Sequence, residues 1–223
     1  MKLAIALYPG FTALDAVGPY EILCRLPDTE TVFVAEQRGE VRADTGSLAF
    51  VADAAFAEVD AADILVVPGG PGSREQLDKL APVVRWIRKV ETTTTWTTSV
   101  CTGSLLLGAA GLLAGLDATT HWGAVELLES FGAHYTGERV VQRGKVITSA
   151  GVSSGIDMAL TLAGIVAGDA YAKSIQLMAE YDPQPPYDAG SVEKAGPEIV
   201  AGVAHLFRPA RATRPADARS DFR

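Results

Sequence analysis

The sequence predicts an α/β fold in which a mostly parallel sheet is covered by helices on both faces. Short apolar runs of strand length alternate along the chain with stretches of helical periodicity, a pattern typical of parallel sheets. Residues 64–67 (ILVV) are apolar without polar alternation, as in a strand that is buried on both sides. These two features define the fold class before any motif is considered.

Length and charge limit the classes of partner. The chain has 223 residues, 48% of them apolar, which is enough for one larger domain with its own core. Its 27 acidic against 19 basic side chains give a net charge of −8, which argues against a nucleic-acid partner. The longest apolar stretch, residues 104–116, is too short to cross a bilayer, and no signal peptide is recognisable. We therefore expect a cytoplasmic protein without a membrane partner.

The first third of the chain predicts a strand, a helix, a second strand, a polar hairpin and a short helix or loop. These elements are expected at residues 2–8, 15–26, 31–35, 40–51 (turning near 44–46) and 53–63.

The remainder continues the alternation, with short strands in its second half. Strands are expected at residues 64–67, 94–100, 118–121, 133–135, 139–142 and 145–148. Helices are expected from about 73 to 91, from about 102 to 115, and at 122–130, 156–167, 170–181 and 197–207.

Two segments are predicted to lack regular structure. The prolines of residues 182–187 restrict the backbone and remove hydrogen-bond donors. Residues 208–223 contain five Arg and two Asp and almost nothing to bury, which predicts a disordered basic tail after a single domain at 1–207.

Cys101 is the strongest candidate for chemistry. It lies where the predicted strand 94–100 turns into a helix, and Gly103 permits a sharp turn there. A helix N-terminus beside the thiol would favour the thiolate, the nucleophilic form. A small buried hydrophobe at a helix start is the structural alternative. With only two cysteines, Cys24 and Cys101, no disulfide framework is expected, and Cys24 is interpreted as helix packing.

Two further features are expected at the carboxyl edge of the sheet, where ligands bind in open parallel sheets. The Gly69–Gly70 turn could aim backbone N–H groups at developing negative charge, although a tight turn alone would also require glycine. Asp15 begins a helix in an otherwise uncharged segment. It could be a helix N-cap, or a carboxyl group with a raised pKa that delivers a proton to a neighbouring thiolate.

His121 and three aromatic residues are weaker candidates. His121 follows a predicted strand and could act near the thiol as a base, or be structural. Trp122, Tyr181 and Tyr187 could form apolar pocket walls. His134 and His205 have no partner in sequence, so we expect no metal site. The glycine turn lacks the Lys of a phosphate loop, so no nucleotide cofactor is expected.

Five motifs together resemble the DJ-1/PfpI superfamily, which is class I glutamine amidotransferase-like. They are residues 14–19 (LDAVGP), 67–70 (VPGG), 99–104 (SVCTGS), 118–122 (ATTHW) and 151–157 (GVSSGID). Residues 101–103, 119–122 and 185–191 (PPYDAGS) resemble the isonitrile (isocyanide) hydratase branch more closely.

The resemblance implies a flavodoxin-like sandwich, usually a homodimer, and an enzyme that needs no cofactor. It implies that Cys101 is the nucleophile, that Asp15 is the acid contacting it, and that the amides of Gly70 and Thr102 form an anion pocket. Protease-like members have His after the nucleophile, whereas this chain has Thr102, which argues against peptide hydrolysis. The implied reaction is hydration of an isocyanide to an N-substituted formamide through a cysteine thioimidate, with Thr102 orienting the thiol or a water.

Three alternatives remain open from the sequence. The same nucleophile could serve a glyoxalase or deglycase that acts on small aldehydes. A reactive thiol could instead serve a redox or stress sensor. The fold also occurs as the sensing module of AraC-type regulators, which carry a further helix-turn-helix domain that is absent from these 223 residues.

Overall fold

The computed structural model describes residues 1–204 of the chain, so the expected tail at 208–223 and the domain boundary expected at 207 lie outside the described residues. By its internal contacts the chain forms two compact units, Met1–Pro183 and a second that begins at Gln184. The first unit contains the sheet and all the candidate site residues except Tyr187.

The first unit is built on a seven-stranded sheet in the order β10-β11-β7-β6-β1-β2-β5. Every neighbouring pair is parallel except β10 and β11. The five central strands follow the flavodoxin-like order, so the predicted fold class is confirmed. The strands of this sheet are β1 (Lys2–Ala6), β2 (Glu30–Ala35), β5 (Ala54–Ala55), β6 (Ile64–Val67), β7 (Trp96–Val100), β10 (Val140–Arg143) and β11 (Val146–Ser149).

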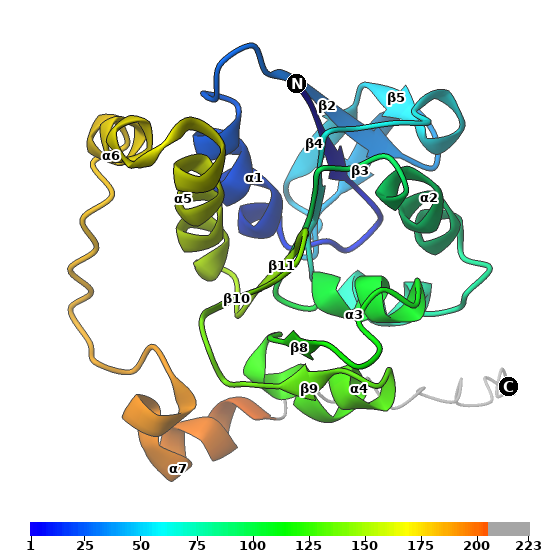
Figure 1. Cartoon of the computed structure of the whole chain (residues 1–223). Coiled ribbons are helices and arrows are strands. Elements are labelled where there is room, and N and C mark those ends of the chain that lie inside the picture. Colours follow the sequence, from blue (N-terminus) through cyan, green and yellow to red (C-terminus); the bar gives the residue numbers. More distant parts are fainter. Residues whose placement is uncertain (205–223) are drawn as a thin grey trace, which may run out of the picture. The chain divides into compact units, whose positions relative to one another are not determined.

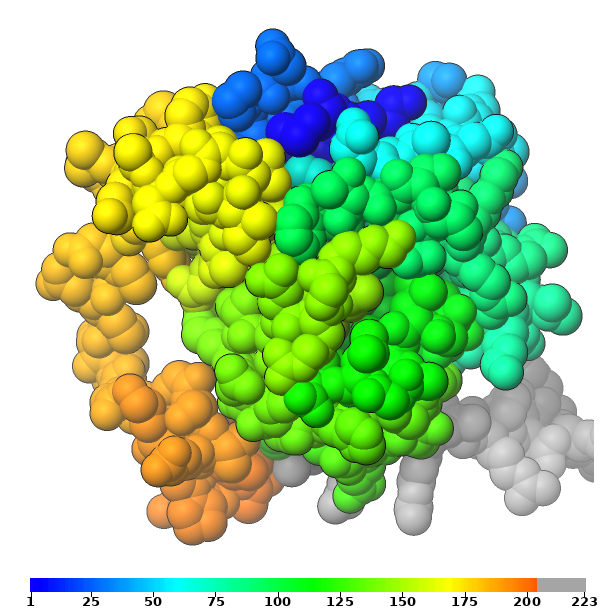
Figure 2. Space-filling model, viewed as in Figure 1, coloured from blue at the N-terminus to red at the C-terminus, as the bar shows by residue number. Residues whose placement is uncertain are grey.

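Helices cover both faces of this sheet. Figure 1 shows α1 and α5 on one side of it and α2 and α3 on the other. In Figure 2 the atoms of α5 and α6 (yellow) form one continuous surface, in agreement with their mutual packing. The helices of the first unit are α1 (Ala13–Leu23), α2 (Pro82–Glu91), α3 (Gly103–Ala109), α4 (Val125–Ser130), α5 (Ser154–Ala167) and α6 (Asp169–Met178).

The sequence explains why these elements form. All four residues of β6, and four of the five in β1, are buried, because these central strands have helices on both faces. Helix α2 begins at Pro82. Its core-facing residues recur at helical spacing and include Val83, Ile87 and Val90, whereas its charged residues point outward. The central strands are thereby fixed in the middle of the core.

The smaller elements complete the unit. A hairpin of β3 (Gly39–Arg42) and β4 (Ala49–Ala52) lies at the predicted position. Short 3-10 helices occur at Phe56–Glu58, Pro71–Gln76 and Trp122–Ala124. A two-stranded sheet pairs β8 (Asp117–Ala118) with β9 (His134–Tyr135).

The strand predicted at 118–121 is wrong beyond Ala118. The backbone N–H of Thr119 donates to Thr148 Oγ1 at 2.9 Å, and the Thr120 hydroxyl donates to the carbonyl oxygen of Cys101 at 3.2 Å. Contacts with side-chain hydroxyls thus replace the strand ladder here. The helix predicted to reach 115 ends at Ala109.

The second unit contains α7 (Val192–Ala204) in its described part. This helix is interrupted at Gly196, whose φ of 76° is non-helical, directly before Pro197. The predicted helix start near 197 therefore corresponds to the second half of α7, and the end predicted at 207 lies outside the described residues.

Gly103 allows the closest backbone approach in the turn between β7 and α3. A Cβ atom at this position would lie 2.0 Å from the carbonyl oxygen of Val67, an atom of the neighbouring strand that cannot move aside easily. The turn therefore has room for glycine and for no other residue.

We expect Gly103→Ala to lower the free energy of unfolding by about 1–3 kcal/mol or to prevent folding, because of this clash. Gly164→Ala in α5 is the matched control, since its Cβ would meet only ordinary contacts at 3.5 Å and beyond. Urea denaturation of both variants measures the difference. Equal stability of Gly103→Ala and the wild type would contradict the packing described.

Candidate active site

Four neighbouring strands bring three predicted site residues and Val152 to one edge of the sheet. The order β11-β7-β6-β1 places the carboxyl ends of these parallel strands side by side. The segments that follow them carry Val152, Cys101, Gly69 and Asp15, respectively. Residues up to 137 positions apart in sequence, such as Asp15 and Val152, therefore contribute to one location.

Cys101 forms the turn between β7 and α3. Its φ of 57° lies in the left-handed region, which is costly for a residue other than glycine. Its backbone N–H is shared between the carbonyl oxygens of Ser149 (3.1 Å) and Ala150 (2.8 Å), which holds this conformation. The side chain is buried, with 5% of the residue exposed.

Asp15 lies in the first turn of α1 and has no exposed surface. The N-cap alternative is wrong, because Thr12 occupies that position and the Asp15 carboxyl group points to the loop that contains Gly69. Its Oδ2 accepts the backbone N–H of Gly69 at 2.9 Å. Within residues 1–204, its Oδ1 has no regular hydrogen-bond partner. The carboxyl group is therefore held firmly by one oxygen, while the other is available for a proton.

Burial raises the pKa of Asp15 from 3.8 to about 7, and the Gly69 amide and the Cys101 thiol lower it by less. Burial also raises the pKa of Cys101, and the neighbouring Asp15 carboxylate raises it further. Burial thus opposes the thiolate that the helix start was expected to favour, and it favours the thiol form in the resting state.

Three donors nevertheless face the sulfur and favour its anionic form. Backbone amides of Val152 and Thr102, and the side chain of Thr102, each lower the pKa of Cys101, although by less than burial raises it. The Val152 amide was missed from sequence because a backbone donor leaves no side-chain signal. A thiolate formed here would be stabilised at once, without rearrangement of water.

The Gly69–Gly70 turn serves the site differently from the prediction. The Gly70 amide donates to Thr102 Oγ1 at 2.8 Å, so it is already engaged within the protein. The Gly69 amide binds Asp15. A Cβ at Gly69 would lie 2.4 Å from the Thr102 nitrogen and 2.9 Å from Cys101 Cβ. The turn therefore packs directly against the segment that contains Cys101 and Thr102. Its two amides position side chains, and the Val152 amide faces the sulfur in the place expected of Gly70.

His121 lies over the loop that carries Val152. Its Nδ1 accepts the backbone N–H of Gly123 at 3.1 Å, and a Cβ added to Gly151 would lie 3.0 Å from its Cδ2. Burial and then Arg74 lower the pKa of His121, which favours the neutral ring. The ring centroid of half-buried Trp122 lies 5.4 Å away. The contact with the cysteine turn comes from the preceding residue, Thr120.

The other residues considered from sequence have structural surroundings. The Tyr181 hydroxyl donates to Asp157 Oδ1 at 2.9 Å, and Asp157 is paired with Arg139. Tyr187 is exposed in the second unit. Cys24 ends α1, and burial raises its pKa. Sequence analysis also missed Tyr8, a buried residue whose hydroxyl donates to the Pro68 carbonyl oxygen at 2.7 Å.

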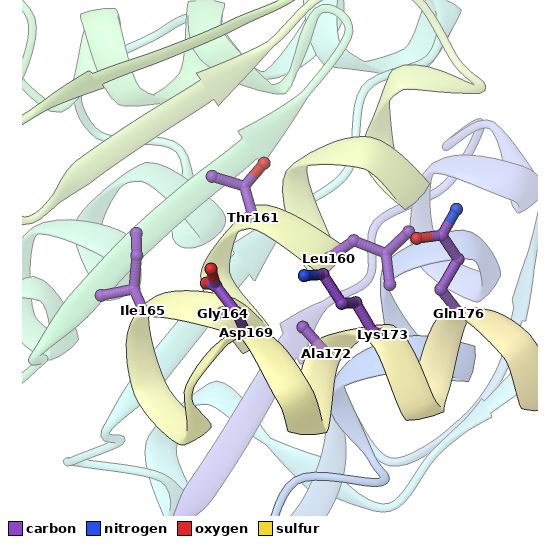
Figure 3. A pocket seen from close by; sticks show the side chains of 8 residues that line it. All are labelled: Leu160, Thr161, Gly164, Ile165, Asp169, Ala172, Lys173 and Gln176. Carbon is purple, nitrogen blue, oxygen red and sulfur yellow. The ribbon is translucent and has the colours of Figure 1, made fainter.

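Two crevices lie on the surface of the first unit. One, of about 510 Å³, separates α5 from α6, and Figure 3 shows side chains of both helices around it, Ile165 and Lys173 among them. The other, of about 490 Å³, lies near the ends of β1 and β2, with Tyr8 in its wall. Neither crevice has a cysteine in its lining, and the chemistry is assigned to Cys101 and its neighbours at the carboxyl edge of the sheet.

Two general properties concern the described part of the chain. Within residues 1–204, no three His, Cys, Asp or Glu side chains are grouped as a metal would require. In the same range, helices are too short or too polar to traverse a membrane.

The raised pKa of Asp15 predicts how stability depends on pH. The protonated form of Asp15 is favoured in the folded state. Its stabilising contribution to the free energy of unfolding is therefore complete below about pH 4 and is lost as pH rises through about 7. We expect the wild type to lose up to about 4 kcal/mol relative to Asp15→Asn over this interval. Urea titrations at several pH values measure the difference. Parallel pH profiles of the two proteins would refute the assignment.

Similar proteins cover most of this chain. The DJ-1/PfpI family model matches residues 1–164. Isonitrile hydratase of Pseudomonas putida is 39% identical, covering 90% of this chain and 87% of that protein. The HTH-type transcriptional regulator CdhR of Pseudomonas aeruginosa is 31% identical, and the matched region covers 70% of this chain and 48% of the regulator. A crystal structure of a ThiJ/PfpI family protein from Pseudomonas syringae superposes with a TM-score of 0.87 at 37% identity, over 92% of this chain and 85% of that one. The chain belongs to the DJ-1/PfpI family.

Proposed function

We propose that this protein is an isonitrile hydratase, which adds water to an isocyanide and releases an N-substituted formamide. The observation that carries the proposal is the buried pair of Asp15 and Cys101, with donors from Thr102 and Val152 facing the sulfur. The similarity to the isonitrile hydratase of Pseudomonas putida, at 39% identity over most of both chains, supports the choice of substrate. The reaction proposed needs no cofactor.

The first half of the reaction adds the thiol across the terminal isocyanide carbon. The Cys101 proton moves to Asp15, and the resulting thiolate attacks that carbon with the amides of Thr102 and Val152 beside it. As the C–S bond forms, the carbon becomes basic and takes the proton from Asp15. The product is a thioimidate, and Asp15 is again ionised. A carboxyl group with a pKa near 7 suits both transfers.

The second half adds water to the thioimidate carbon. The Asp15 carboxylate removes a proton from the water as its oxygen attacks, and delivers that proton to the imine nitrogen. The tetrahedral intermediate then collapses and the C–S bond breaks. The hydroxyl proton returns to the sulfur through Asp15, so the formamide leaves and the resting thiol is restored. One water is consumed, and no charge is gained or lost.

The redox-sensor alternative receives less support from the same geometry. Peroxide oxidises thiolates, and selective sensors keep a low thiol pKa and an accessible sulfur. Here burial raises the pKa of Cys101, and only 5% of the residue is exposed. A substrate that enters the site and accepts the proton from Asp15 fits this thiol better than peroxide does.

The proposal includes a cytoplasmic homodimer and a pocket wall at His121 and Trp122. Family membership supports the dimer, since the resemblance implies one. The neighbouring rings, 5.4 Å apart beside the Val152 loop, support the wall. Sedimentation equilibrium tests the dimer, and a purely monomeric protein at micromolar concentration would count against it.

We expect the wild type to convert cyclohexyl or para-nitrophenyl isocyanide to the formamide, and Cys101→Ala to lose about 10³-fold or more in kcat/KM. Asp15→Asn should lose about 10²-fold or more, because the proton carrier is removed. Cys24→Ala is the matched control and should keep full activity. Formamide is quantified by liquid chromatography.

Full activity in Cys101→Ala would overturn the mechanism. Absence of turnover by the wild type, together with turnover of methylglyoxal, would move the assignment to aldehyde chemistry.

A further inference from the structure

Ser73 is a buried hydroxyl to which the mechanism has so far given no part. It lies in the short 3-10 helix after the Gly69–Gly70 turn and has no exposed surface. Its Oγ donates a hydrogen bond to Thr102 Oγ1 at 2.9 Å. Ser73 therefore reaches the residue next to Cys101 without lying beside the sulfur itself.

The hydrogen bonds of Thr102 limit what its hydroxyl can do. A threonine oxygen accepts about two hydrogen bonds and donates one. Both acceptor positions are filled, by the Gly70 amide at 2.8 Å and by Ser73 at 2.9 Å. The Thr102 proton must therefore point away from both donors.

Two acceptors are within reach of that proton. One is the carbonyl oxygen of Gly70, 3.1 Å from Thr102 Oγ1, which also accepts the backbone N–H of Ser73 at 3.0 Å. The other is the sulfur of Cys101, with which the Thr102 side chain interacts. A protonated sulfur is a weak acceptor, and an anionic one is strong. The carbonyl oxygen is favoured in the resting state and the sulfur after its proton has moved to Asp15.

We propose that Ser73 is a positioning residue that fixes the Thr102 hydroxyl as a hydrogen-bond donor, so that it turns from Gly70 to the Cys101 thiolate when that thiolate forms. The inference rests on the proposed function only in taking Cys101 as the nucleophile. Donation from Ser73 also polarises the Thr102 hydroxyl and strengthens its own donation. The effect of Ser73 on the sulfur thus passes entirely through Thr102.

Alkylation of the single thiol in a Cys24→Ser background tests this without any isocyanide. The rate of reaction with iodoacetamide is followed against pH to obtain the apparent pKa of Cys101. We expect Ser73→Ala to raise this pKa and to slow alkylation at neutral pH by roughly five- to tenfold. The titratable groups that face the sulfur, Asp15 and Tyr8, are unchanged in this variant.

A double-mutant cycle with Thr102→Val shows whether the effect passes through Thr102. Adding Ser73→Ala to Thr102→Val should change the alkylation profile by less than twofold. Thr98→Val removes another fully buried hydroxyl, which donates to the Leu65 carbonyl oxygen at 3.0 Å, and is the matched control. It should leave the profile unchanged. Ser73→Gly also removes the hydroxyl and adds neither bulk nor a second thiol. It should give the same shift, and it replaces Ser73→Ala should that variant fail to fold.

An unchanged Cys101 profile in Ser73→Ala or Ser73→Gly would overturn the inference. An equally large effect of Ser73→Ala with and without Thr102→Val would overturn it too, because Ser73 would then act by another route. Ser73→Ala could raise the Cys101 pKa as expected while the wild type hydrates no isocyanide. That result would support the inference and refute only the proposed function.

Discussion

The site depends on one costly placement, a buried carboxyl group beside a buried thiol. Asp15 is fully buried, and the Gly69 amide is the regular hydrogen-bond donor that holds it. Burial penalises the charged form of both groups, so the pair retains a proton at a pH where a solvent-exposed carboxyl group would have lost it. The same penalty that reduces stability keeps a transferable proton next to the nucleophile, which is what an addition reaction at neutral pH requires.

The fold holds this arrangement through close backbone contacts rather than through charge. Cys101 keeps a positive φ because its N–H is bound at the end of β11, and Gly103 lets α3 start against the carbonyl oxygen of Val67. Gly69 lies so close to Cys101 and Thr102 that any side chain there would displace them. Rigid strands on both sides therefore set the distance between carboxyl group and sulfur, as a preorganised site requires.

Sequence reasoning could predict the sheet, because uninterrupted apolar strands such as 64–67 leave few alternatives. It could also predict Cys101 and Asp15, whose residue types stand out from their surroundings. It failed where the outcome depends on tertiary contacts. The charge state of Cys101 depends on desolvation, which no local pattern reports, and the strand at 118–121 ends early because hydroxyl groups bind Thr119 and Cys101. Two contacts depend on how loops that are distant in sequence meet in the fold. In one, the Val152 amide faces the Cys101 sulfur, and in the other, the Gly70 amide donates to Thr102.

The protonation of Asp15 can be measured directly. Carbon-13 labelling of the aspartate carboxyl groups, with Asp15→Asn used to assign the signal, allows its titration to be followed by NMR. We expect a midpoint near pH 7, and a higher midpoint in Cys101→Ala, because the thiol lowers the pKa of Asp15. A midpoint near 4, the same in both proteins, would show that the carboxyl group is ordinary and would contradict the proton-sharing pair on which the proposed chemistry rests.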